Sequence, residues 1–205
     1  MTRLTIALDA DGVLLDYSTA YGRAWADAFG EHPVERDPSA YWPFHRWAVE
    51  RLTGARLERF RASFHLGFWS SLPAIAGALE ACHRLHDAGY ELVCVSAVGP
   101  EFERARFQNL RELGFPIERV MATGSGSTEV SPKAEALHTL KPVAFVDDFL
   151  PYFRGVNDGM HRALVTRQPN GSPNVGMELS VVDSQHSDLD AFASWWLSAG
   201  CAICD

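Results

Sequence analysis

Two pairs of aspartates each follow a short apolar run of the chain. Asp9 and Asp11 come just after residues 4–8, and Asp147 and Asp148 come directly after residues 143–146. A short apolar run is typical of a buried strand in a parallel sheet. Aspartate is also common in exposed turns, but ligands bind beyond the carboxyl ends of such strands, so we expect these carboxylates to meet. A hard divalent cation such as Mg²⁺ would relieve their mutual repulsion.

The spacing of the first pair suits phosphoryl transfer. Asp9 and Asp11 are two residues apart, so both side chains can point to the same side of the chain. One carboxylate can attack phosphorus and form an aspartyl-phosphate. The other can protonate the leaving oxygen and then activate water. Gly12 would let the chain turn tightly and bring backbone N–H groups near a phosphate.

The segment Asp9-Ala10-Asp11-Gly12-Val13 resembles motif I, DxDG[VT], of the haloacid dehalogenase-like (HAD) superfamily of phosphohydrolases. Three further motifs follow in the family's order. Ser96, at the end of an apolar run, is similar to motif II, and Lys133, near a predicted helix start, is similar to motif III. Asp147 and Asp148 resemble motif IV. The resemblance covers the chain from residue 4 to about residue 166.

The resemblance implies a Mg²⁺-dependent phosphatase that hydrolyses a small phosphomonoester through an aspartyl-phosphate. Asp9 would be the nucleophile and Asp11 the acid and base, with Ser96 and Lys133 completing the catalytic set. The implied Mg²⁺ ligands are Asp9, Asp11 through its backbone carbonyl, Asp147 and Asp148. The implied phosphate-binding residues are Asp11, Gly12, Ser96, Ala97 and Lys133. Lys141, the only other lysine, precedes a predicted strand and therefore lies at the wrong end of the sheet.

Several reactions of the superfamily remain open at this point. The dehalogenase branch lacks an aspartate two residues after the nucleophile, so Asp11 favours a phosphate ester over an organohalide. A phosphomutase shares all four motifs, and a non-catalytic domain that binds a phosphorylated ligand or a protein is a third alternative. Residues 164–170 faintly resemble the deoxynucleotidase-like branch, which makes a nucleotide monophosphate a candidate substrate.

Apolar runs alternate with helical patterns along most of the chain, which predicts an α/β fold with a mostly parallel sheet and helices on both faces. The resemblance implies that this sheet is HAD-like (Rossmannoid). We expect strands near residues 4–9, 91–97, 119–122, 143–146 and 161–166. We expect helices near 74–88, 101–113 and 132–139, and a last helix capped by Ser187. Residues 16–72 break the alternation and are predicted to form a small helical insert, and the resemblance implies that it is a cap of the C1 type. The core would then comprise residues 1–15 and 73–205.

The predicted insert is rich in aromatic residues and arginine. Its rings at residues 41–47 and 60–69 have helical or near-helical spacing, and we expect most of them to pack the insert. One or two can face the cleft and stack on a base or sugar. Its arginines are predicted to lie mostly on a solvated face. The insert contains seven Arg and seven acidic residues, so the remainder of the chain carries the whole net charge of −8.

Composition excludes several other functions. A net charge of −8 argues against a nucleic-acid polymer or an anionic membrane as partner. We find no apolar run long enough to cross a bilayer and no secretory leader, so we expect a cytoplasmic protein with reduced cysteines. Cys94 is expected in the core. The role of Cys201 and Cys204 and the oligomeric state are left open.

Overall fold

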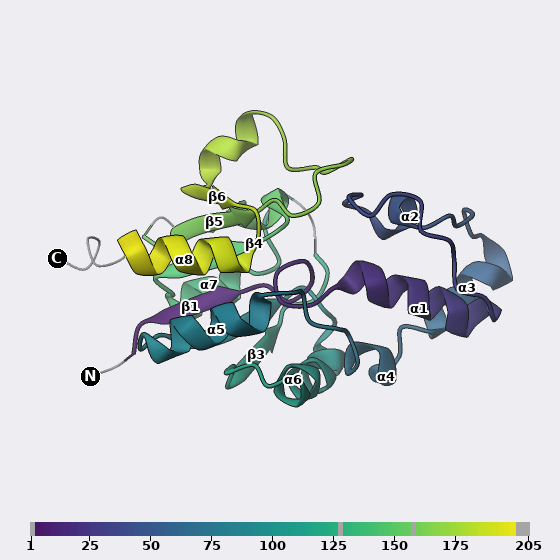
Figure 1. Ribbon diagram of the computed structural model, residues 1–205, viewed down its shortest axis with the longest axis horizontal. Coiled ribbons are helices and arrows are strands. Elements are labelled where there is room, and N and C mark those ends of the chain that lie inside the picture. Colours follow the sequence, from purple (N-terminus) through teal and green to yellow (C-terminus); the bar gives the residue numbers. More distant parts are fainter. Residues whose placement is uncertain (1–2, 127–128, 157–158, 200–205) are drawn as a thin grey trace.

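The computed structural model describes residues 3–126, 129–156 and 159–199 and contains one six-stranded parallel sheet (Figure 1). Its strand order is β3-β2-β1-β4-β5-β6, so the predicted α/β fold is confirmed. β6 was not predicted, because its three residues are polar and lie at the edge of the sheet. The strands are β1 (Thr5–Leu8), β2 (Glu91–Ser96), β3 (Arg119–Ala122), β4 (Ala144–Asp147), β5 (His161–Val165) and β6 (Ser184–His186).

The chain changes direction across the sheet at β1. After β1 the chain adds β2 and β3 on one side, and then returns to add β4 on the other. Leu8 therefore pairs with Cys94 of β2 and with Val146 of β4. In parallel α/β sheets, the carboxyl ends of strands at such a switch point form the crevice in which ligands bind.

Helices cover both faces of the sheet. The longer ones are α5 (Ala78–Asp87), α6 (Glu103–Glu112), α7 (Ala134–Leu140) and α8 (Leu189–Ala199). On one face, Cys82 of α5, Leu110 of α6 and Phe192 of α8 join the apolar side chains of the strands. On the other face, Leu137 of α7 packs against Phe145. The short 3₁₀ helices are η1 (Pro100–Phe102), η2 (Leu150–Phe153) and η3 (Met177–Val181).

Four helix starts differ from the prediction. α6 begins at Glu103 rather than at residue 101, because η1 precedes it. α5 begins after Gly77, whose φ of 80° is outside the helical region, so the expected start at residue 74 was too early. α7 begins at Ala134, and the hydroxyl of Ser131 accepts a hydrogen bond from the backbone N–H of Lys133 at 3.2 Å. Asp188, rather than the predicted Ser187, caps α8, because its carboxylate accepts a hydrogen bond from the N–H of Ala191 at 2.7 Å.

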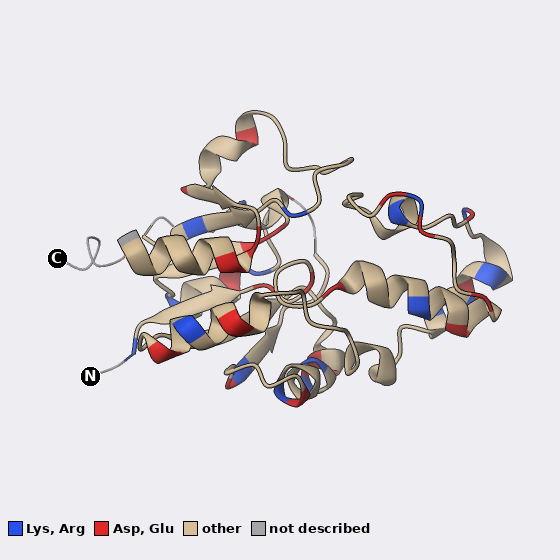
Figure 2. Cartoon of the chain, in the orientation of Figure 1, with Lys and Arg blue, Asp and Glu red and all other residues tan. Residues whose placement is uncertain are grey.

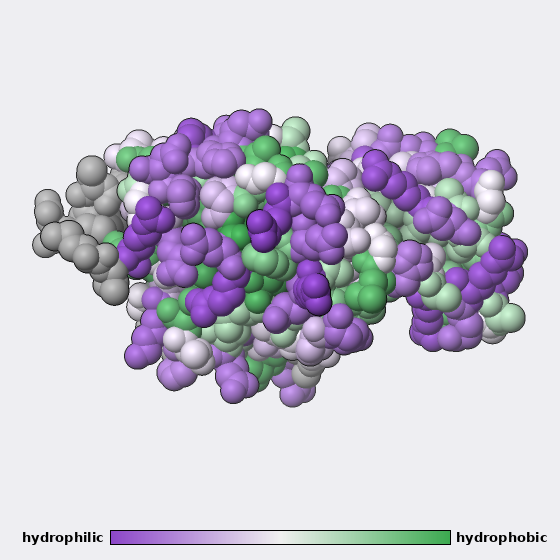
Figure 3. All heavy atoms as spheres, turned by 90° about the horizontal axis from the view of Figure 1, so that it is seen from below, coloured by the Kyte–Doolittle hydropathy of each residue, from purple (hydrophilic) through white to green (hydrophobic). Residues whose placement is uncertain are grey.

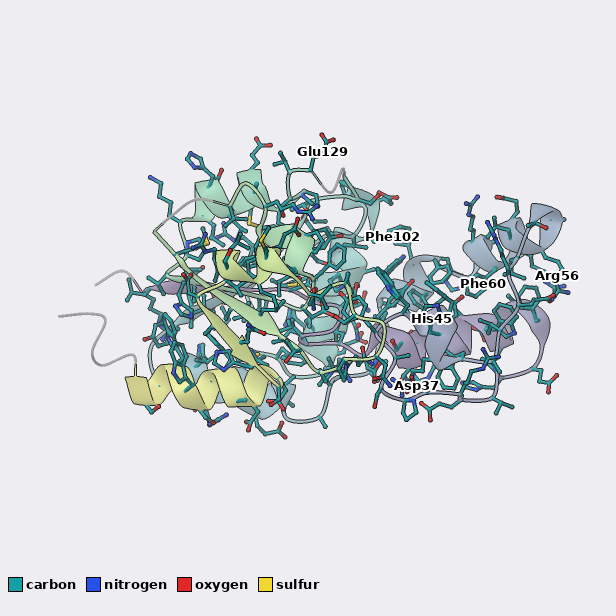
Figure 4. All side chains as sticks on the ribbon, turned by 90° about the horizontal axis from the view of Figure 1, so that it is seen from above. Asp37, His45, Arg56, Phe60, Phe102 and Glu129 are labelled. Atoms are coloured by element: carbon teal, nitrogen blue, oxygen red, sulfur yellow. The ribbon has the colours of Figure 1, made fainter. Side chains whose placement is uncertain are left out.

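Residues 16–72 contain α1 (Tyr17–Phe29), α2 (Pro43–Arg46), α3 (Gly54–Ala62) and α4 (Leu66–Trp69). Figure 1 shows these helices beside the sheet, beyond the ends of its strands, and we call this segment the helical insert. Its core is aromatic: the rings of Trp25 and Phe60 lie 5.4 Å apart, and both side chains are buried. In Figure 4, Phe60 lies within the insert, and Arg56 lies at its far end, away from the sheet.

The two segments that connect the insert to the sheet lie side by side. The N–H of Asp16 donates to the carbonyl of Pro73 at 2.8 Å, and the N–H of Ile75 donates to the carbonyl of Leu14 at 2.9 Å. Within the described ranges, no helix is long and apolar enough to span a membrane.

The returning segment is held by one buried side chain of α6. Asn109, 3% exposed, accepts a hydrogen bond from the N–H of Leu72 and donates one to its carbonyl, at 3.1 and 3.0 Å. Since Leu72 is itself buried, its polar backbone atoms have little access to water.

We therefore predict that Asn109→Ala lowers the free energy of unfolding by about 2–4 kcal/mol, because it leaves two buried backbone groups unpaired. Urea denaturation at constant m-value measures this loss. The control is Gln108→Ala, at an exposed neighbouring position whose side chain donates a hydrogen bond to Glu112, with an expected change below about 0.5 kcal/mol. Equal stability of the two variants would contradict the prediction.

Candidate active site

A buried lysine joins the ends of the two central strands. Lys133 lies just before α7, its side chain is fully buried, and its ammonium group pairs with the carboxylates of Asp9 and Asp147. The Nζ–Oδ2 distance to Asp147 is 2.6 Å. Burial alone would lower the pKa of Lys133, but these two carboxylates raise it above its usual value. The lysine therefore stays charged and ties β1, β4 and α7 together.

Three of the predicted acidic residues form one cluster. Asp9, Asp147 and Asp148 each offer a carboxylate oxygen, and these oxygens lie within 4.8 Å of one another. Burial raises the pKa of Asp147 to about 7, against the opposing effect of Lys133. Burial, with the charges of Asp147 and Asp9, also raises the pKa of Asp148 well above its usual range. When all three are ionised, one ammonium leaves two negative charges uncompensated, so the cluster fits a divalent cation with oxygen ligands.

Asp11 has a different partner. Its Oδ2 accepts a hydrogen bond at 2.8 Å from Nη2 of Arg106, a fully buried residue of α6. Burial raises the pKa of Asp11, although the Arg106 guanidinium acts against that rise. The side chain of Asp11 does not belong to the three-carboxylate cluster. The two motif I aspartates thus pair with different cations, Asp9 with Lys133 and Asp11 with Arg106.

Gly12 allows the first loop to approach the second. Its φ is 93°, in the left-handed region, and a Cβ atom at this position would lie 2.2 Å from Oδ2 of Asp148. The Asp148 carbonyl accepts hydrogen bonds from the Tyr41 hydroxyl at 3.2 Å and from Asn174 Nδ2 at 2.7 Å. The close packing of the two acidic loops therefore requires glycine here.

These loops line a cavity of about 430 Å³ between the sheet and the helical insert. Acidic segments gather where the sheet meets α1 (Figure 2), and apolar atoms lie among polar ones at the narrow part of the molecule beside the insert (Figure 3). The predicted site residues that line the cavity are Asp9, Asp11, Gly12, Ala97 and Asp148. Three other predicted residues, Ser96, Lys133 and Asp147, are at most 1% exposed and are not part of the lining.

Aromatic rings form much of the remaining wall. The insert contributes Tyr17, Tyr41, Trp42 and Trp69, and the segment after β4 contributes Phe149 and Tyr152. More rings therefore reach the cavity than the one or two expected. The large rings that pack the interior of the insert instead include Trp47, Phe60 and Phe68, which are buried.

Sequence reasoning missed two kinds of polar residue. Arg167 and Gln168, just after β5, line the cavity, and each has a buried side-chain nitrogen without a hydrogen-bond partner among the described residues. The sequence signal for these two residues was their position directly after a predicted strand, where ligand-binding residues of such sheets lie. Arg106 was missed because arginine is frequent in this chain. Its signal was its position beside the buried Ala105 and four residues before the buried Leu110.

Other candidate residues do not reach the site. Three of the seven insert arginines pair with acidic residues of the insert: Arg46 with Glu35, Arg56 with Glu50 and Arg61 with Glu58. Cys94 is buried in the core, as expected. Cys201 and Cys204 lie outside the described residues.

We predict that Gly12→Ala destabilises the protein more than Gly89→Ala does. Gly89 also has a positive φ, of 98°, but a Cβ there would meet no atom within 4 Å. Both variants carry backbone strain of about 1–2 kcal/mol, whereas only the first adds a collision with Asp148, which costs about 1–3 kcal/mol more. The difference is measured by urea denaturation. Equal losses would show that the two acidic loops are not packed as described.

Comparisons with known proteins give matches in structure alone. No family model matches the sequence, and no curated protein matches it significantly. A HAD family hydrolase from Deinococcus radiodurans R1, solved with bound phosphate and sodium, is similar with a TM-score of 0.65 at 14% identity, over 97% of this chain and 96% of that one.

Two further solved structures have different names but similar folds. The L-2-haloacid dehalogenase from Xanthobacter autotrophicus has a TM-score of 0.58 at 13% identity, over 95% of this chain and 98% of that one. A putative β-phosphoglucomutase from Thermotoga maritima has a TM-score of 0.58 at 16% identity, over 95% and 99%. At such low identity the likeness concerns the fold, and it agrees with the four ordered motifs. The chain therefore has the haloacid dehalogenase-like fold.

Proposed function

We propose that the protein is a Mg²⁺-dependent phosphatase that hydrolyses a small phosphomonoester through an aspartyl-phosphate on Asp9. The observation that carries this proposal is the cluster in which Lys133 pairs with Asp9 and Asp147 while Asp148 lies alongside. Phosphoryl transfer depends mainly on positioning and on neutralising charge. A buried ammonium beside a three-carboxylate cluster is suited to both.

Asp9 is the proposed nucleophile. It lines the cavity, and Lys133 holds its Oδ1, so its orientation is restrained before a substrate binds. Asp11 lies two residues further on, also at the cavity, and its raised pKa suits a group that gives a proton to the leaving oxygen. The same group then takes a proton from the water that hydrolyses the aspartyl-phosphate.

We assign the remaining motif residues to binding Mg²⁺ and to binding the phosphate group. Mg²⁺ would be held by Asp9, Asp147, Asp148 and the carbonyl of Asp11, and when bound it would neutralise negative charge on the phosphate. Backbone N–H groups near Gly12 and Ala97, which line the cavity, would hold phosphate oxygens. Ser96 is buried directly behind Ala97, so its proposed contact with phosphate needs a small opening of this wall.

Asp11 also supports a phosphate ester rather than an organohalide as the substrate. A halide leaves without a proton, whereas an alkoxide needs one, and Asp11 supports a phosphate ester. We propose hydrolysis as the outcome, although a phosphomutase shares all four motifs, Asp11 included. A mutase would yield an isomeric phosphate ester instead of inorganic phosphate.

We further propose that residues 16–72 act as a cap and that the leaving group contains a planar ring. Trp42 and Tyr41 of the insert face the cavity, and a ring that stacks on such side chains gains about 1–3 kcal/mol. The unpartnered nitrogens of Arg167 and Gln168 at the same cavity can donate to acceptor atoms of the ring. A nucleoside monophosphate meets these requirements.

The first test concerns the nucleophile and the metal. We expect hydrolysis of 4-nitrophenyl phosphate with Mg²⁺, loss of this activity in excess EDTA, and recovery when Mg²⁺ is restored. Asp9→Asn should reduce kcat/KM by more than about 1,000-fold because it removes the attacking carboxylate. Asp27→Asn, which changes an exposed aspartate of α1, is the control and should keep full activity. Activity that survives EDTA or Asp9→Asn would refute the proposed mechanism.

The second test concerns the ring. We expect kcat/KM to be higher for benzyl phosphate than for glycerol 3-phosphate, and Trp42→Ala to reduce this ratio by about 10-fold through the loss of stacking. Leu66→Ala changes an exposed apolar residue of the insert that does not line the cavity, and it should leave the ratio unchanged. A ratio that Trp42→Ala does not alter would exclude a ring subsite at this wall.

A further inference from the structure

Arg106 is a fully buried arginine with one polar partner. Its Nη2 donates to Asp11 Oδ2 at 2.8 Å, while its Nε and Nη1 have no hydrogen-bond partner in the part of the chain that the structure describes. Arg84 of α5, by comparison, is partly exposed and donates to both Asp190 and Ser194. Burying a guanidinium with two unpaired nitrogens is costly, so stability alone does not account for Arg106.

The guanidinium also contacts the insert. Its Cζ lies 5.1 Å from the ring centroid of Trp69, within the range of a cation–π interaction. The Trp69 indole N–H donates to the carbonyl of Phe64 at 3.1 Å, and its ring lies 5.6 Å from that of Phe102. Figure 4 places Phe102 on the side of the core that faces the insert. The insert thus forms one side of the environment of Arg106.

Two side chains on one face of α6 make polar contacts with the loop of Asp11 and with the end of the insert. Arg106 and Asn109 are three residues apart, so they lie on the same side of the helix. Asn109 binds the backbone of Leu72, at the end of the insert, and Arg106 binds Asp11. Since α6 belongs to the sheet-covering helices, it can hold Asp11 in a place set by both the core and the insert.

Arg106 itself does not line the cavity, so a ligand in the cavity does not reach its guanidinium. Any effect on the reaction must therefore pass through Asp11. Without the bond to Oδ2, the carboxyl group could rotate about its own axis and away from the leaving oxygen, and proton transfer needs donor and acceptor within hydrogen-bond reach.

We propose that Arg106 is a positioning residue, which holds the carboxyl group of Asp11 in place for proton transfer to the leaving-group oxygen. This inference rests on the proposed phosphatase function, because it assigns Arg106 a part in that reaction. It goes beyond the four motifs, none of which contains Arg106.

The test compares two ring-bearing esters with unlike leaving groups. Benzyl phosphate releases an alkoxide, which needs a proton, whereas 4-nitrophenyl phosphate releases a stable phenolate, which does not. The parameter is kcat/KM, which covers steps up to the formation of the aspartyl-phosphate. We expect Arg106→Gln to lower it by about 100-fold for benzyl phosphate but by less than about 5-fold for 4-nitrophenyl phosphate.

Matched variants separate this role from a structural one. Asp11→Asn should show the same selectivity between the esters, and adding Arg106→Gln to it should cause no further loss, because both changes remove one function. Arg106→Lys keeps the positive charge and should show a smaller loss of kcat/KM with the same selectivity between the esters. This variant provides the test if Arg106→Gln does not fold. Arg104→Gln, at an exposed site of α6, should behave as wild type.

Two results would overturn the inference while leaving the phosphatase proposal intact. The first is an equal loss on both esters in Arg106→Gln or Arg106→Lys. The second is a further loss when Arg106→Gln is added to Asp11→Asn. If the wild-type protein hydrolyses neither ester with Mg²⁺, the proposed function fails, and the role of Arg106 fails with it.

Discussion

The candidate site depends on a buried ammonium group between two buried carboxylates. Lys133 pairs with Asp9 at the end of β1 and with Asp147 at the end of β4, and it is fully shielded from water. Removing one member of such a buried cluster leaves uncompensated charge, at a cost of about 3–5 kcal/mol. The same ion pairs fix the ends of the two central strands and the start of α7, so the stability of this region and the geometry of the site have one origin.

Around this lysine, negative charge is distributed unequally. Asp11 is paired with Arg106, whereas Lys133 pairs with both Asp9 and Asp147, and Asp148 lies beside them under the further influence of the Arg167 charge. The pair of Asp11 and Arg106 is thus close to electrical neutrality, whereas the three-carboxylate cluster favours a cation. This difference gives two aspartates of one short loop separate chemical environments, which is what a nucleophile and a proton donor require.

The helical insert shapes the site without adding net charge to it. Its arginines and acidic residues balance, and its contribution to the cavity consists mainly of rings. It is also tied to the core at several points: Tyr41 bonds to the carbonyl of Asp148, and Leu72 is held by Asn109. Under the proposed function, the insert would select the leaving group, and the charges at the strand ends would act on the phosphate.

The sequence by itself determined the parallel α/β fold and the loops that carry Asp9, Asp11, Asp147 and Asp148, because apolar runs and the residues that end them are local patterns. It did not determine which side chains meet across the fold. Arg106 lies 95 positions from Asp11 in the chain, and its place beside Ala105 and four residues before Leu110 does not indicate which residue it meets. Only tertiary packing decided that this one is buried against the site, which rings face the cavity, and that Lys133 lies beneath its wall. Such contacts depend on how whole helices pack on the sheet, a property that short-range periodicity does not encode.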